Sequence, residues 1–227
     1  MKRSEINRYI TEAKRFFDQH QFLLPPFALW TPADWRTKGH ECDEIRDNLL
    51  GWDLTDFGSG DYARVGLLLF TIRNGSFSNP AYPKEYAEKI MIVREGQHTP
   101  MHFHWSKCED IINRGGGELV IQLYMADQKD DSQFDGKPFA VVTDGVRRTV
   151  RPGQTVRLAP GESITLVSHM YHEFWAEGGM TLVGEVSKVN DDRTDNRFRT
   201  APGRFPAIEE DEPPLHHLCT EYPPARP

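Results

Sequence analysis

From Leu54 onward, the chain is a series of short β-rich segments separated by residues that favour turns. Turn signals such as Asp144-Gly145 and Pro152-Gly153 fall between many of these segments. Numerous short strands at this spacing are typical of an antiparallel β-sandwich or barrel. The predicted strands cover residues 63–73, 87–95, 100–105, 108–113, 117–124, 139–142, 147–150, 154–158, 162–167, 171–176 and 180–188.

The segments on either side of this β-rich region have a different pattern. Residues 1–22 carry apolar side chains at spacings of three and four, which predicts an amphipathic helix. Thr31 followed by Pro32 is typical of the start of a further short helix, around Trp35. Residues 198–227 contain seven of the sixteen prolines, which argues against a helix or a central strand there.

These features predict a single all-β domain over residues 1–227. At about 150 residues per domain, this length suits one domain with additional segments at its ends. A helical extension is expected over residues 1–53 and a β-barrel of two antiparallel sheets over residues 54–197. A proline-rich, irregular tail is expected over residues 198–227, packed on the barrel or on a partner subunit.

The composition excludes several classes of protein. A net charge of −7 argues against a nucleic-acid-binding protein, which usually has a basic face. No run of eighteen apolar residues is present, so no membrane span is expected. The charged N-terminal segment does not resemble a signal peptide, and Cys42, Cys108 and Cys219 show no CxxC spacing. We therefore expect a cytoplasmic protein with free thiols.

Candidate metal ligands lie close together in the segment that precedes residue 110. In a strand, residues i and i+2 point to the same face, so His102 and His104 are expected to project together into the barrel. Glu109 lies five residues after His104, which allows a tight turn and a return strand beside the first. Two imidazoles and one carboxylate suit a divalent first-row metal such as Mn, Fe, Co, Ni or Zn. His169 or His172, in a second histidine-containing segment, is expected to supply a fourth ligand.

The spacing of these residues resembles the two motifs of the cupin family. The first motif consists of glycine, five residues, His-x-His, four residues, glutamate, six residues and glycine, and it is met by Gly96, His102, His104, Glu109 and Gly116. Gly161 and His172 match the second motif, whereas Val167, His169 and Ala176 replace its proline, glycine and asparagine. The resemblance implies a jelly-roll-like cupin barrel with His172 as the fourth metal ligand and His169 as a minor alternative.

Three longer segments resemble the cupin-type D-lyxose isomerases. They are EKIMIVREGQHTPMHFHWSK over residues 88–107, YHEFW over 171–175 and GEVSKVNDDRTDNRF over 184–198. This resemblance implies interconversion of D-lyxose and D-xylulose, and of D-mannose and D-fructose. It also implies a preference for Mn²⁺ and a homodimer.

Two residues are candidates for acid–base work at such a site. Glu185 lies in the middle of a short apolar segment, and inside the barrel it would be a buried carboxylate that needs a partner. A raised pKa would let it carry a proton near neutral pH. Lys89 begins the strand that leads to Gly96, and from the interior its ammonium would stabilise charge on a sugar oxygen. The alternative for both residues is an ordinary position on the outer surface.

The remaining candidates have more than one interpretation. Asp192 and Arg193 follow the last strand, either as a solvated turn or as residues that recognise sugar hydroxyl groups at the barrel mouth. Phe103 and Trp105 alternate with the two histidines, so they are expected on the opposite face of the strand, in the core or an interface. His98 is expected in a loop or behind the ligands, from where it could also touch a sugar hydroxyl.

The sequence therefore predicts a metal-dependent aldose–ketose isomerase that moves a proton through a cis-enediol, with a hydride shift as the alternative mechanism. An Fe²⁺-dependent cupin dioxygenase is the first alternative, because the same four ligands can hold iron. A sugar-phosphate isomerase would need a cluster of Arg and Lys near the motifs, and no such cluster is present. A non-catalytic sugar-binding cupin is the alternative from another class, although such proteins commonly lose metal ligands.

Overall fold

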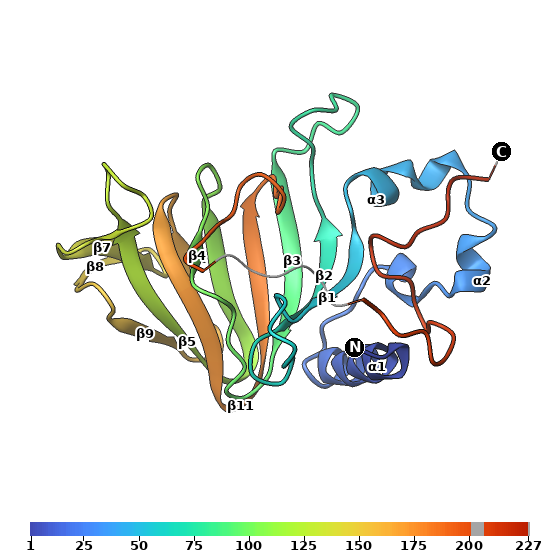
Figure 1. Ribbon diagram of the computed structural model, residues 1–227, viewed down its shortest axis with the longest axis horizontal. Helices are drawn as coiled ribbons and strands as arrows, with labels where there is room; N and C mark the ends of the chain where they lie inside the picture. The colour runs from blue at the N-terminus through green and yellow to red at the C-terminus, as the bar shows by residue number, and fades with distance from the viewer. Residues whose placement is uncertain (201–206, 227) are drawn as a thin grey trace.

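The computed structural model describes residues 1–200 and 207–226, and antiparallel strands dominate it (Figure 1). The helices are α1 (Arg3–Gln19), η1 (Pro26–Leu29), α2 (Pro32–Trp35), η2 (His40–Cys42) and α3 (Asp43–Asp47). The strands are β1 (Gly51–Thr55), β2 (Leu67–Arg73), β3 (Tyr86–Val93), β4 (His102–Phe103), β5 (Glu109–Ala126), β6 (Phe134–Asp135), β7 (Phe139–Thr143), β8 (Val146–Val150), β9 (Thr155–Leu158), β10 (Ser163–Leu166), β11 (Met170–Lys188) and β12 (Arg197–Phe198). Residues 201–206 and 227 of the predicted tail lie outside the described residues.

The strands pair in the order β1-β2-β3-β11-β5-β10-β7-β8, and β4, β6, β9 and β12 pair beside this path. The pairings between these named strands are antiparallel, which confirms the predicted all-β class. The two longest strands, β5 and β11, each combine two of the predicted strands and pair with each other along most of their length. The two predicted sheets are therefore joined through β5 and β11 into one hydrogen-bonded network.

A glycine-rich segment explains why β5 is continuous where the sequence predicted a turn. Gly116 has a positive φ of 96°, and a Cβ at this residue would lie 2.1 Å from the carbonyl oxygen of Met180. Only glycine permits this close approach of β5 to β11. The register between the two strands shifts between Glu177 and Thr181, opposite this segment. The glycines thus bend a paired strand instead of ending it.

The strand β1 lies partly within the stretch that the sequence assigned to a helical extension. It pairs with β2 from Gly51 to Thr55, so residues on both sides of the predicted boundary at 53/54 belong to the sheet. Trp52 and Leu54 are buried, and Asp53 between them points to the opposite face. This alternation is the pattern of a strand with two covered faces, and it places Asp53 at the barrel interior.

Two apolar layers hold the structure together, one on each face of β2. Leu67 and Leu69 belong to the cluster inside the barrel, whereas Leu68 and Phe70 belong to a second cluster under α1. The helix contributes the side chains of Ile6, Ile10, Ala13, Phe16 and Phe17 to that second cluster. The periodicity of residues 1–22 thus predicted the correct buried face, although the helix itself ends at Gln19. No helix in the described part of the chain has the length and apolar character of a membrane span.

The described part of the tail packs on the helices of its own chain (Figure 1). Arg3 in α1 is buried and lies 2.6 Å from carboxylate oxygens of both Glu210 and Glu221. The ring of Tyr222 stacks on Trp35, with 4.0 Å between the ring centroids. These contacts join the two ends of the chain outside the barrel.

Candidate active site

Three histidines meet inside the barrel. His102 lies on β4 and pairs with His172 on β11, while His104 follows β4 directly. One ring nitrogen from each of the three lies within 4.8 Å of the other two. Glu109, at the start of β5, places Oε1 3.5 Å from His104 Nε2 and 3.3 Å from His172 Nε2. The structure thus brings together the four residues that the sequence predicted as metal ligands.

The orientation of each imidazole is fixed by a backbone carbonyl oxygen. His102 Nδ1 donates to Pro100 (2.8 Å), His104 Nδ1 to Asp195 (2.9 Å) and His172 Nδ1 to Met170 (2.9 Å). A carbonyl oxygen only accepts hydrogen bonds, so each Nδ1 carries the hydrogen and each Nε2 keeps its lone pair. This is the arrangement that holds and orients histidine ligands of metal ions in proteins.

The protonation of these groups also suits a metal ion. Burial lowers the pKa of His102 well below its usual range and lowers the pKa of His172 to about 4. Burial alone would raise the pKa of Glu109, but the Lys107 ammonium and His104 lower it well below its usual range. Neutral imidazoles and an ionised carboxylate are the forms that bind a metal. The donor set therefore fits a divalent cation.

Replacement of His172 tests which of the two histidines in the second motif, His169 or His172, is the metal ligand. We expect His172→Ala to lower the metal affinity at least tenfold, because it removes one nitrogen of the cluster. His169→Ala is the matched control: His169 is exposed and lies against the ring of Phe103, outside the cluster. Metal content per chain, measured by atomic emission after dialysis, checks this. Metal loss in the His169 variant alone would contradict the assignment.

Glu185 and Lys89 face the same interior. They lie opposite each other in the pairing of β11 with β3, and each is 5% exposed. Lys89 Nζ is 3.7 Å from Glu185 Oε1 and 3.7 Å from Asp192 Oδ2, and it donates to Asn190 Oδ1 at 2.8 Å. The outer-surface alternatives for Glu185 and Lys89 are therefore wrong. Asp192 is close enough to complete the group of charges at the barrel mouth.

Lys107 is a central residue of the site that the sequence analysis missed. Its Nζ lies 2.7 Å from Glu109 Oε2, 2.9 Å from Glu185 Oε1 and 3.0 Å from Asn190 Oδ1. Burial would lower its pKa, but the carboxylates of Glu109 and Glu185 raise it far above its usual range. Lys107 is therefore a buried cation between the metal cluster and Glu185. Sequence spacing carries little signal for this residue, because Lys107 lies in the turn before β5, where strand alternation does not apply.

The loop that follows β11 holds this lysine in place. Asp195 accepts hydrogen bonds from the backbone N–H groups of Ser106 (2.8 Å) and Lys107 (2.9 Å). The backbone oxygen of Asp195 is also the acceptor for His104. One buried residue thus fixes both a histidine of the cluster and the turn that carries Lys107.

These groups surround a cavity of about 460 Å³. Its walls include Asp53, Thr55, Phe57, Leu67, Leu69, Lys89, Met91, Thr99, His102, His104, Lys107, Glu109, Ile111, His172, Phe174, Glu185, Asp192, Arg193, Asn196 and Phe198. Phe198 stacks on His102, with ring centroids 5.2 Å apart. Arg193 has a largely exposed side chain at the mouth, and burial raises the pKa of Asp53 to about 7. The cavity therefore joins a metal-binding end to a polar, charged end.

The aromatic residues beside the cluster lie as the strand alternation predicts. Phe103 is fully buried against Tyr171 and Ala126, on the face opposite the histidines. Trp105 is 38% exposed and packs edge-on against Phe103. His98 stacks on Trp175 with ring centroids 4.7 Å apart, and it does not line the cavity.

Comparison with known proteins decides which family this site belongs to. A family model described as D-lyxose isomerase matches residues 1–222. The chain belongs to the D-lyxose isomerase family. A D-lyxose/D-mannose isomerase of Serratia proteamaculans is 51% identical over 225 residues, which cover 98% of each chain. A D-lyxose/D-mannose isomerase of Escherichia coli O157:H7 shows the same identity and coverage.

Solved structures of more distant proteins share the fold of this D-lyxose isomerase family member. L-ribose isomerase of Cellulomonas parahominis superposes with a TM-score of 0.60 at 19% identity, over 92% of this chain and 98% of that one. L-ribose isomerase of Acinetobacter sp. DL28, solved with L-ribose, gives a TM-score of 0.61 at 17% identity and the same coverage. These likenesses support the predicted cupin-like fold. Together with the family membership, the relatives identify the chain as a sugar aldose–ketose isomerase.

Proposed function

We propose that this chain interconverts D-lyxose and D-xylulose, and also D-mannose and D-fructose. The relatives that share 51% of its residues over nearly their whole length are D-lyxose/D-mannose isomerases. The observation that carries the proposal is the position of Glu185 and two lysines beside the histidine cluster in one cavity. Such a cavity combines a site for a metal with a proton carrier and cations for sugar oxygens.

His102, His104, Glu109 and His172 would hold a divalent metal, for which we propose Mn²⁺. Co²⁺, Fe²⁺, Ni²⁺ and Zn²⁺ also accept this ligand set. The metal would supply Lewis-acid polarisation of the sugar carbonyl, which acidifies the neighbouring C–H bond. Side chains of the protein would transfer the protons and bind the sugar.

Glu185 is the proposed proton carrier. Its carboxylate takes the proton from C2 of the open-chain aldose while the Lys89 ammonium gives a proton to O1, and the cis-enediol forms. Glu185 then returns its proton to C1 while neutral Lys89 takes the proton of the O2 hydroxyl, so the C2 carbonyl forms and both side chains regain their starting states. Lys107 and Lys89 lie 2.9 Å and 3.7 Å from Glu185 Oε1, so they fix the carboxylate in position.

Lys89, Asp192 and Arg193 are the proposed contacts of the sugar. Lys89 would stabilise negative charge on O1 or O2 during proton transfer. Lys89 and Lys107 lower the pKa of Asp192, although burial opposes them, so Asp192 is ionised and can accept hydrogen bonds from sugar hydroxyl groups. Arg193 at the mouth can donate to them.

A homodimer in the cytoplasm is proposed for the assembled protein. The dimer rests on family resemblance. The proposed cytoplasmic location rests on the cysteines: all three are free, and the buried apolar clusters hold the fold together without disulfide bonds.

A sugar panel tests the proposed reaction. The purified protein is stripped of metal with a chelator and reloaded with Mn²⁺, and ketose formation is followed from D-lyxose, D-mannose, D-xylose and D-ribose. We expect Mn²⁺-dependent conversion of D-lyxose to D-xylulose and of D-mannose to D-fructose. Absence of turnover with every sugar, despite a loaded metal site, would contradict the proposal. Oxygen consumption with Fe²⁺ would then support the dioxygenase alternative.

A further inference from the structure

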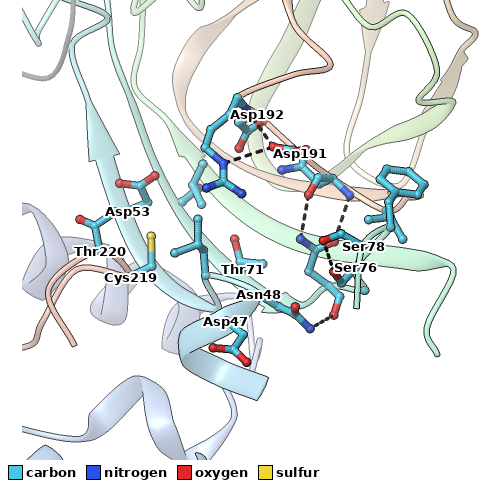
Figure 2. Close-up of a pocket in the computed structure, with 18 residues that line it drawn as sticks. Asp47, Asn48, Asp53, Thr71, Ser76, Ser78, Asp191, Asp192, Cys219 and Thr220 are labelled. Carbon is cyan, nitrogen blue, oxygen red and sulfur yellow. Dashed lines mark hydrogen bonds and ion pairs between the residues drawn. The ribbon is translucent and has the colours of Figure 1, made fainter. Parts of the chain in front are cut away.

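A second cavity, of about 330 Å³, adjoins the first one (Figure 2). In Figure 2, Asp53 and Cys219 border it on one side, and Ser76 and Ser78 lie on the other. Its volume lies within the range of about 300 to 1,000 Å³ that is usual for small-molecule sites. It is built from β1, β2, the β2–β3 loop, the loop after β11 and the C-terminal tail.

The two cavities are neighbours with different chemistry. They share only Asp53, Leu69, Asp192 and Arg193 as lining residues. None of the four proposed metal ligands, and neither Lys89 nor Glu185, lines the second cavity. The second cavity therefore lies beyond the mouth of the catalytic one and is not part of the metal site.

Thr71 contributes a hydroxyl group to the wall of the second cavity. This residue is 6% exposed, and among the described residues no side-chain hydrogen bond of its hydroxyl is present. It pairs with Lys89 across β2 and β3, and Figure 2 shows it in the middle of the lining residues. The Thr71 hydroxyl is not among the fully buried atoms that lack a partner, so it is accessible from the cavity, where a ligand hydroxyl group can form a hydrogen bond with it.

The charges in the wall restrict what the second cavity can bind. Asp47, Asp53, Asp191 and Asp192 contribute carboxyl groups, and Arg193 contributes the only cationic side chain among the described lining residues. An excess of carboxylates repels phosphate and other anions. Within the described residues, the histidine cluster of the first cavity is the only group with metal-binding spacing, so these carboxylates do not form a metal site. Neutral hydroxyl groups fit, because they donate to carboxylates.

An aromatic ring stands at the rim of the cavity. Phe77, in the β2–β3 loop, is 69% exposed and lines the second cavity only. Exposure of a phenyl ring is unfavourable in water, and the C–H face of a sugar ring is an apolar surface that can cover it. An aromatic platform together with carboxylates and a free hydroxyl is a combination suited to a pyranose ring.

We propose that the second cavity is an accessory binding site for a neutral sugar in its closed pyranose form. Thr71 and the aspartates would bind the hydroxyl groups, and Phe77 would cover one face of the ring. The site would hold a sugar next to the mouth of the catalytic cavity. The inference goes beyond the proposed isomerase activity and does not depend on it, because it concerns binding alone.

The test uses methyl α-D-mannopyranoside, a ring-locked sugar that cannot open and so cannot be isomerised. Its affinity for the Mn²⁺-loaded protein is measured by titration calorimetry. We expect Phe77→Ala to weaken binding about fivefold or more, as loss of one aromatic contact does. Thr71→Val, which keeps the shape of the side chain, is expected to have a similar effect through one lost hydrogen bond. Tyr86→Ala, at an exposed ring outside both cavities, is the matched control and should leave the affinity unchanged.

A further variant shows whether the sugar occupies the catalytic cavity instead. Phe198 lines only that cavity. If Phe198→Ala weakens binding and Phe77→Ala does not, the glycoside binds beside the metal cluster and the proposal is wrong. Absence of binding up to the solubility limit of the glycoside also overturns it. Because Phe77 is exposed, its replacement should not unfold the protein, so a failure of Thr71→Val to fold still leaves a decisive measurement.

Discussion

Glu185→Gln should lower kcat for D-lyxose about 100- to 10,000-fold, the usual contribution of a general acid–base group. The amide keeps the size of the side chain but cannot take a proton from carbon. Glu185 is not a member of the histidine cluster, so the metal content should stay unchanged. The rate is measured by ketose formation, and the metal by atomic emission on the same sample.

The surroundings of Glu185 should keep the Glu185→Gln variant folded, so a loss of activity would report on proton transfer. The residue is 5% exposed, and Lys107 Nζ and Lys89 Nζ lie 2.9 Å and 3.7 Å from its Oε1. An amide oxygen can still accept a hydrogen bond from Lys107, so the cavity keeps its shape. We therefore expect KM to change much less than kcat.

Glu173→Gln is the matched control. Glu173 lies on the same strand, β11, is half-buried, and lines neither cavity. Its replacement should leave kcat close to that of the wild type. Full activity of Glu185→Gln would remove this residue from the proton-transfer step. Loss of the metal together with the activity would instead assign Glu185 a role in support of the metal site.

Lys107→Met should destabilise the metal-free protein by about 3–5 kcal/mol, the usual cost of removing one partner of a buried ion pair. Lys107 lies between Glu109 and Glu185, with Nζ–Oε distances of 2.7 Å and 2.9 Å, and all three side chains are buried. Methionine fills a similar volume but leaves the buried Glu109 carboxylate without its lysine and Glu185 with only Lys89, at 3.7 Å. The free energy of unfolding is measured by urea denaturation in the presence of a chelator.

A bound metal should reduce this loss, because a divalent cation beside Glu109 replaces part of the missing charge. The same denaturation with saturating Mn²⁺ is therefore expected to show a smaller difference between Lys107→Met and wild type. Lys188→Met, at an exposed position on β11, is the control and should change the stability by less than about 0.5 kcal/mol. Equal stability of Lys107→Met and wild type without metal would show that Lys107 does not compensate these carboxylates.

The sequence alone determined the features that depend on local spacing. The i, i+2 relation of His102 and His104 predicted that both rings point to the same side, and the opposite parity predicted Phe103 in the core. The spacing of three and four in residues 1–22 gave the buried face of α1. Local periodicity is a property of neighbouring residues, so it can be recognised without knowledge of the fold.

Sequence patterns were less informative where local and tertiary effects compete. The glycines near Gly116 favour a turn locally, yet pairing between β5 and β11 keeps that segment extended and only bends it. The strand β1 has only five residues, and its identity depends on its hydrogen bonds to β2 and the packing of Trp52 under α1. Tertiary packing overrides a local preference of this size.

Only the tertiary structure decided how the charges of the site are arranged. Lys107 meets Glu185 across 78 residues of sequence, and Lys89 meets Asn190 across 101. Asp53 reaches the interior because β1 joins the edge of the sheet, and this also creates the wall shared by the two cavities. Such contacts depend on strand order and register, which no short spacing encodes. The sequence therefore determined the residues that can hold a metal, and the fold determined which buried charges surround them.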